Sequence, residues 1–141
     1  MALLVDGDAC PDLMLIKKIA LKKQVEMIVY VDYAHYIQDD YFKTIICDVG
    51  KDSCDLNLLN DLKEGDLVIT QDYGLASLAL GKGAKVIHVS GKMIDEDNID
   101  ELLMSRYISS KQRKAKVHLK GPGKRSKAIQ QQFLKQLKRH L

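Results

Sequence analysis

The chain has 141 residues and a net charge of +3, and its 46% hydrophobic and 29% charged residues are ordinary for one soluble domain. A short apolar run with no basic residue ahead of it precedes Asp6, and no stretch approaches the roughly 18 apolar residues of a membrane span. The three cysteines lack C-x-x-C spacing, which argues against a disulfide framework or a zinc site. The sequence therefore predicts one cytoplasmic domain over residues 1–141, with reduced thiols and no membrane partner.

Buried strands and amphipathic helices alternate along the chain. Residues 3–5 form an apolar run that stops at Asp6, which is typical of a buried parallel strand. Apolar residues then recur at helical spacing over 13–23, behind a proline at the first turn. The other expected elements are strands at 26–31, 43–48, 66–70 and 84–88, helices at 52–63, 75–80 and 94 to about 108, and a last helix in which Ile129, Phe133, Leu137 and Leu141 step by four.

This order of elements predicts an α/β fold. Strands that alternate with helices imply βαβ crossovers, and therefore a mostly parallel sheet with helices on both faces. Ligands of such sheets bind beyond the carboxyl ends of the strands. Polar side chains that follow the predicted strands are therefore the first candidates for a functional site.

Aspartates occupy these positions. Asp6 and Asp8 follow the first predicted strand, and Asp72 follows the fourth. Asp52 and Asp55 open the helix after the third strand, and their spacing places both on one face of its first turn. Carboxylates packed together repel one another unless they are protonated or bind cations, and Mg²⁺ and Mn²⁺ prefer oxygen ligands. The sequence therefore predicts a Mg²⁺ or Mn²⁺ site at this edge of the sheet.

Each aspartate also has a simpler structural explanation. Asp8, Asp52 and Asp72 stand where a helix N-cap is expected, and Asp55 stands where an acid offsets the helix dipole. Four such aspartates at one end of one sheet are harder to explain by three caps and one helix-dipole acid than by a shared site. Both interpretations remain open at the level of sequence.

The charge is divided unevenly along the chain. Residues 1–101 carry 10 basic and 19 acidic side chains, whereas residues 102–141 carry 12 basic side chains and no acid. A basic, helical C-terminal segment from about residue 106 is expected to bind a phosphate polyanion such as RNA or single-stranded nucleic acid, although it could simply keep a terminal helix soluble. The expected contacts are Arg113, Lys114, Lys116, Lys120, Lys124 and Arg125.

Several motifs together resemble the YaiI/YqxD family of uncharacterised bacterial proteins. They are Val-Asp-Gly-Asp-Ala-Cys-Pro at 5–11, Lys-Asp-Ser-Cys-Asp at 51–55 and Gly-Asp-Leu-Val-Ile-Thr-Gln-Asp-Tyr-Gly-Leu-Ala at 65–76. The resemblance continues into 81–84 and into Lys-Gly-Pro at 120–122, so it covers nearly the whole chain.

That family looks like a branch of the PIN-like superfamily. The resemblance implies a three-layer domain with a mostly parallel five-stranded sheet in the order 3-2-1-4-5, and a ribonuclease dependent on Mg²⁺ or Mn²⁺. On this basis Asp6, Asp55 and Asp72 match the catalytic acidic positions best, with Asp8 and Asp52 as additional metal ligands. The fold is the stronger implication, because a fold does not determine an activity.

Two other functions compete with a nuclease. The chain could be a non-catalytic nucleic-acid-binding module that keeps the fold and the basic segment. Alternatively, Asp6-x-Asp8 resembles the opening motif of haloacid-dehalogenase-type phosphatases, in which Asp6 would be the nucleophile and Asp8 the acid/base. The sequence leaves the oligomeric state open, with a dimer among the options.

Overall fold

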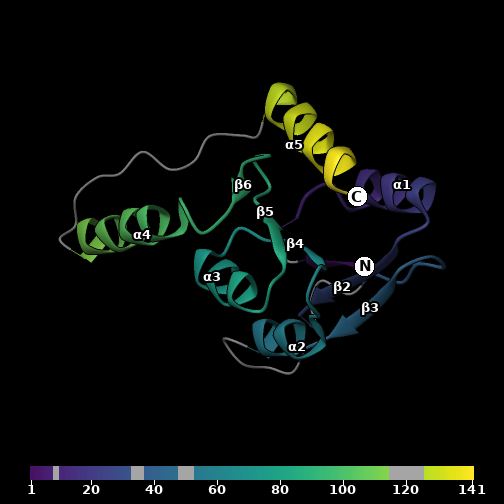
Figure 1. Cartoon of the computed structure of the whole chain (residues 1–141), viewed down its shortest axis with the longest axis horizontal. Coiled ribbons are helices and arrows are strands. Elements are labelled where there is room, and N and C mark those ends of the chain that lie inside the picture. The colour runs from purple at the N-terminus through teal and green to yellow at the C-terminus, as the bar shows by residue number, and fades with distance from the viewer. Residues whose placement is uncertain (8–9, 33–36, 48–52, 115–125) are drawn as a thin grey trace.

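A computed structural model describes residues 1–7, 10–32, 37–47, 53–114 and 126–141, apart from the side chains of 110 and 112–114 (Figure 1). The strands are β1 (Ala2–Asp6), β2 (Glu26–Val31), β3 (Lys43–Ile46), β4 (Leu67–Ile69), β5 (Lys85–Ile87) and β6 (Met93–Ile94). The helices are α1 (Leu13–Lys23), α2 (Ser53–Asp61), α3 (Tyr73–Gly81), α4 (Ile99–Lys114) and α5 (Lys127–His140). Among the described residues, no helix is both long and apolar enough to cross a membrane.

All the strands belong to one sheet in the order β3-β2-β1-β4-β5-β6. The first five strands are parallel, and β6 pairs antiparallel to β5. The predicted α/β fold and the order of its five parallel strands are confirmed.

The sixth strand was not predicted, and the helix expected from residue 94 begins later. Gly91, at φ +91°, forms the turn between β5 and β6, where its amide bonds to the carbonyl of His88. The Asp95 carboxylate then accepts from the amides of Asp97 and Asn98, a local turn that delays the helix until Ile99. Ile94 therefore belongs to β6, where it is buried.

Helices cover the two faces of the sheet (Figure 1). Because side chains alternate along a strand, Leu3 and Val5 face one side with α1 and α5, whereas Leu4 faces the other side. Phe133 and Leu137 of α5 are fully buried in the first layer. The second layer holds α2 and α3, and the first turns of α4 pack against it. The sheet therefore separates two apolar cores.

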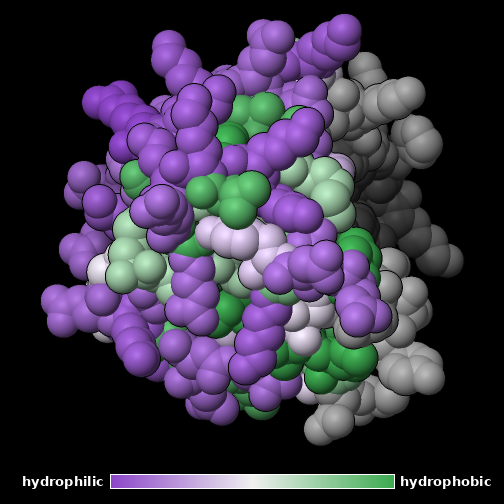
Figure 2. Space-filling model, turned by 90° about the vertical axis from the view of Figure 1, so that its right-hand side faces the viewer, coloured by the Kyte–Doolittle hydropathy of each residue, from purple (hydrophilic) through white to green (hydrophobic). Residues whose placement is uncertain are grey.

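The side of the molecule that faces right in Figure 1 is covered mostly by hydrophilic side chains, with apolar ones in separate patches (Figure 2). This is the usual balance for the surface of a globular domain. The described part of that side therefore gives no sign of a broad apolar interface.

We expect Gly91→Ala to destabilise the protein by about 2 kcal/mol or more, measured by urea unfolding. A Cβ at Gly91 would lie 2.8 Å from the backbone nitrogen of Phe133 in α5, and the backbone at Gly91 has a positive φ. Gly81→Ala is the matched control, since a Cβ there meets nothing within 4 Å and Ala favours the end of α3. Equal stability of the two variants would contradict this close packing of α5 on the β5–β6 turn.

Candidate functional site at the carboxyl edge of the sheet

Asp6, Thr70 and Asp72 meet where β1 and β4 end. The hydroxyl of Thr70 donates to Oδ2 of Asp6 at 3.0 Å and accepts from the backbone amide of Asp72 at 3.0 Å. Thr70 is fully buried, whereas Asp6 and Asp72 are half-buried. A single buried hydroxyl therefore links the carboxylate of one strand end to the backbone that carries the other.

Asp72 is the N-cap of α3. Its Oδ1 accepts from the amides of Gly74 at 2.8 Å and Leu75 at 3.2 Å, which satisfies two of the helix's first donors. The capping interpretation is thus confirmed for this residue. Capping also holds the carboxylate at the carboxyl edge of the sheet, so it does not exclude a second role.

Arg106 of α4 brings a positively charged side chain to this site. Its Nη1 lies 2.9 Å from Oδ1 of Asp72, and the two side chains are 54% and 33% exposed. An exposed pair of this kind adds little stability. Its importance lies in position, because a guanidinium beside a carboxylate can bind a phosphate oxygen when an anion arrives.

Asp55 lies in the first turn of α2, as predicted, and is half-buried. The residue before it, Cys54, forms a disulfide with Cys47, and their Cα atoms are 5.2 Å apart. The prediction of three reduced thiols is therefore wrong for these two cysteines, while Cys10 is buried and keeps its thiol. The pair escaped prediction because an odd cysteine count with no short motif does not indicate which residues meet.

Several predicted site residues lie outside the described residues. They are the metal ligands Asp8 and Asp52 and the nucleic-acid-binding residues Lys116, Lys120, Lys124 and Arg125. Arg113 and Lys114 belong to the last turn of α4, and the structure describes only the backbone of these two residues. Within the described part of the chain, no three His, Cys, Asp or Glu side chains are grouped so as to hold a metal ion. The described carboxylates therefore supply oxygen donors of the right type for Mg²⁺ or Mn²⁺ but do not by themselves complete a metal centre.

His88 follows β5 and lies near the start of α3. Its ring is 5.6 Å from that of Tyr73, and its Nδ1 is 2.8 Å from Oγ of Ser90. Burial, and to a lesser extent the charge of Lys92, lowers the pKa of His88. These contacts give the ring a structural role.

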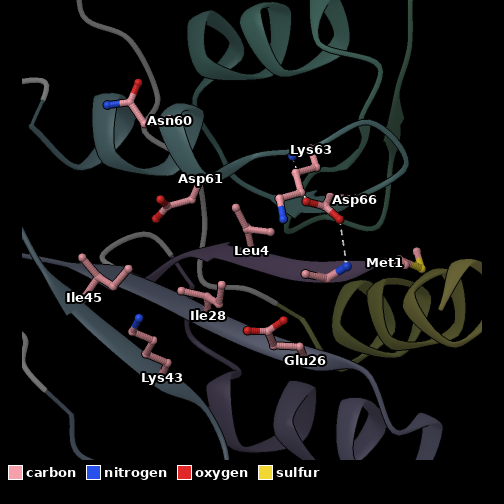
Figure 3. Close-up of a pocket in the computed structure, with 11 residues that line it drawn as sticks. Met1, Leu4, Glu26, Ile28, Lys43, Ile45, Asn60, Asp61, Lys63 and Asp66 are labelled. Atoms are coloured by element: carbon pink, nitrogen blue, oxygen red, sulfur yellow. Dashed lines mark hydrogen bonds between the residues drawn. The ribbon is translucent and has the colours of Figure 1, made fainter.

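A hollow of about 440 Å³ lies at the opposite, amino edge of the sheet (Figure 3). Its apolar lining comes from Leu4, Ile28 and Ile45 of the three neighbouring strands β1, β2 and β3. The charged and polar side chains around it are Glu26, Lys43, Asn60, Asp61, Lys63 and Asp66.

Two of the rim carboxylates are held by the fold. Asp66 accepts from the amides of Ala2 at 2.8 Å and Lys63 at 2.9 Å. Asp61 accepts from the hydroxyl of the buried Tyr30 at 2.7 Å, and burial together with this bond raises the pKa of Tyr30 well above its usual range. The hollow and the predicted site therefore lie at opposite ends of the strands.

The fold and the carboxyl edge define a class of protein: a three-layer α/β domain with a mostly parallel sheet and aspartates at the carboxyl ends of its strands. A family model for the uncharacterised YaiI/YqxD family matches residues 4–141. The chain belongs to this family, as its motifs predicted. The description of the family names no activity.

Curated relatives support the assignment. A UPF0178 protein of Clostridium acetobutylicum is 42% identical over 135 residues, which cover 94% of this chain and 91% of that protein. A UPF0178 protein of Clostridium tetani is 44% identical over 125 residues, which cover 89% of this chain and 86% of that protein. No solved structure gives a significant match.

We expect Asp72→Ala to lower the free energy of unfolding by about 1 kcal/mol, because the first amides of α3 lose their acceptor. Asp72→Asn should remain within a few tenths of a kcal/mol of the parent, since Asn caps a helix as well as Asp does. Urea unfolding of the three proteins checks this. An equal loss in both variants would mean that the charge of Asp72, rather than its capping bonds, stabilises α3.

Proposed function

We propose that the protein is a divalent-metal-dependent nuclease that hydrolyses phosphodiester bonds, with RNA as its expected substrate. The observation that carries the proposal is the link from Asp6 through Thr70 to Asp72, which joins the acidic ends of two neighbouring strands beside Arg106. Asp55 lies in the first turn of α2, which follows β3, and Asp72 caps α3, which follows β4.

In this proposal the acidic residues hold the metal ion and the basic residue binds the phosphate. Thr70 orients the carboxylate of Asp6, and the α3 amides orient that of Asp72, so both are fixed before a ligand arrives. Arg106 is placed to bind a non-bridging phosphate oxygen next to these acids. A bound Mg²⁺ or Mn²⁺ would supply an activated water and neutralise charge on the scissile phosphate. In this proposal Asp8 and Asp52 complete the ligand set.

In this proposal the basic C-terminal segment supplies affinity for the nucleic acid. Residues 102–141 carry 12 basic side chains without an acid, and a polyanion gains affinity with each phosphate that such a segment neutralises. Binding of this kind weakens as salt rises, because counterions released from the nucleic acid drive it. We therefore assign binding to this segment and bond cleavage to the carboxyl edge.

The test is cleavage of end-labelled single-stranded RNA in Mn²⁺, in Mg²⁺ and in chelator. The parent should cut only with metal, and Asp55→Asn and Asp72→Asn should each lose on the order of 100-fold in rate. Asn at position 72 keeps the helix cap, so its effect reports the lost charge rather than unfolding. Glu64→Gln is the control, since Glu64 is an exposed acid before β4, at the amino edge.

Two results would overturn the nuclease proposal. Equal cleavage by the parent and both Asn variants would identify a contaminating ribonuclease. Absence of cleavage, together with salt-sensitive RNA binding, would favour the non-catalytic binding module instead.

A further inference from the structure

The two sides of α4 have different surroundings. On one side Ile99 is buried, and Leu102 and Leu103 pack against the core that holds α2 and α3. Arg106 continues this side and reaches Asp72 at the start of α3. These contacts fix α4 in place beside the candidate site, while the helix extends away from the sheet (Figure 1).

The other side of α4 carries large exposed side chains. Met104 is 58% exposed, Tyr107 57% and Ile108 49%, at the spacing of three and four residues that places them on one helix face. Lys111, one turn further, holds its Nζ 5.5 Å from the centre of the Tyr107 ring. We name these four residues the α4 platform.

We propose that the α4 platform binds single-stranded nucleic acid, with a base stacked on Tyr107 and a phosphate bound by Lys111. Nucleic-acid bases stack on exposed aromatic rings regardless of sequence, and a neighbouring cation contacts the backbone. Met104 and Ile108 flank the ring and extend the apolar surface that a base covers. The proposal deepens the proposed function and rests on it, because it describes how the substrate of that same site is held.

Charge favours a nucleic acid over an apolar protein partner. No acidic residue occurs after Glu101, so the distal part of α4 itself offers a polyanion only neutral and basic side chains. The cation that contacts Tyr107 is already in place for a phosphate next to the stacked base. The platform and Arg106 lie on opposite sides of one helix, which separates them by roughly 10 Å, about the reach of two nucleotides.

Binding of a labelled single-stranded 12-mer RNA, followed by fluorescence anisotropy in chelator, tests the platform. Tyr107→Ala should weaken binding about 10-fold, whereas Tyr107→Phe should stay within about twofold because it keeps the ring. Lys111→Gln should weaken binding less and reduce the salt slope by about 0.7, the value for one phosphate on a single strand. Lys22→Gln, an exposed lysine in the last turn of α1, is the matched control and should leave binding unchanged.

Working in chelator separates this proposal from the nuclease proposal, because no metal-dependent cleavage occurs there. Loss of cleavage in Asp72→Asn, together with weakened binding in Tyr107→Ala, supports both proposals. Binding by Tyr107→Ala that equals the parent's would overturn the platform and leave the nuclease proposal standing. A change in sedimentation mass caused by Tyr107→Ala would also overturn the platform proposal, since the α4 platform would then join copies of the chain.

Discussion

The parallel pairing of β1 with β4 is the contact on which the candidate site depends. Val5 lies opposite Ile69, so the next residues along each strand are Asp6 and Thr70, whose side chains form a hydrogen bond. A shift of one residue in this register would break the bond and turn the apolar side chains of β1 to the wrong cores. The same pairing that builds the two cores therefore also builds the acidic edge, across a gap of 64 residues.

Asp72 shows why capping and chemistry need not be alternatives. A helix that begins at the carboxyl edge requires an acceptor for its first amides, and an aspartate supplies one while its charge remains available to Arg106. Family membership identifies relatives but no reaction, so any assignment of function must come from such groups. The difference in stability expected between Asn and Ala at position 72 follows from the same capping bonds.

The fold was predictable because each buried element carries its own local signal. The bounds of α1 and β2 agree with the expected 13–23 and 26–31, since helical spacing and an apolar run mark them clearly. β6 was missed because a two-residue strand has no period. Its limits are set by the Gly91 turn after β5 and by the Asp95 turn before α4.

Within the site, the position of Asp72 could be predicted, but its partner could not. The contact from Arg106 crosses 34 residues, and only tertiary packing of α4 brings the two together. The Cys47–Cys54 pair is likewise set by how α2 returns to the end of β3. Sequence patterns describe neighbours along one element, and these contacts join different elements.

The place of β1 in the centre of the sheet has a consequence for biosynthesis. β1 is made first, yet one of its edges stays open until β4 emerges, and the apolar face of Leu3 and Val5 gains Phe133 and Leu137 only when α5 is complete. Domains fold as units during synthesis, and exposed strand edges in incomplete chains promote aggregation. The nascent chain must therefore be shielded until α5 has emerged, and ribosomes that stall before α5 would release a product with one core uncovered.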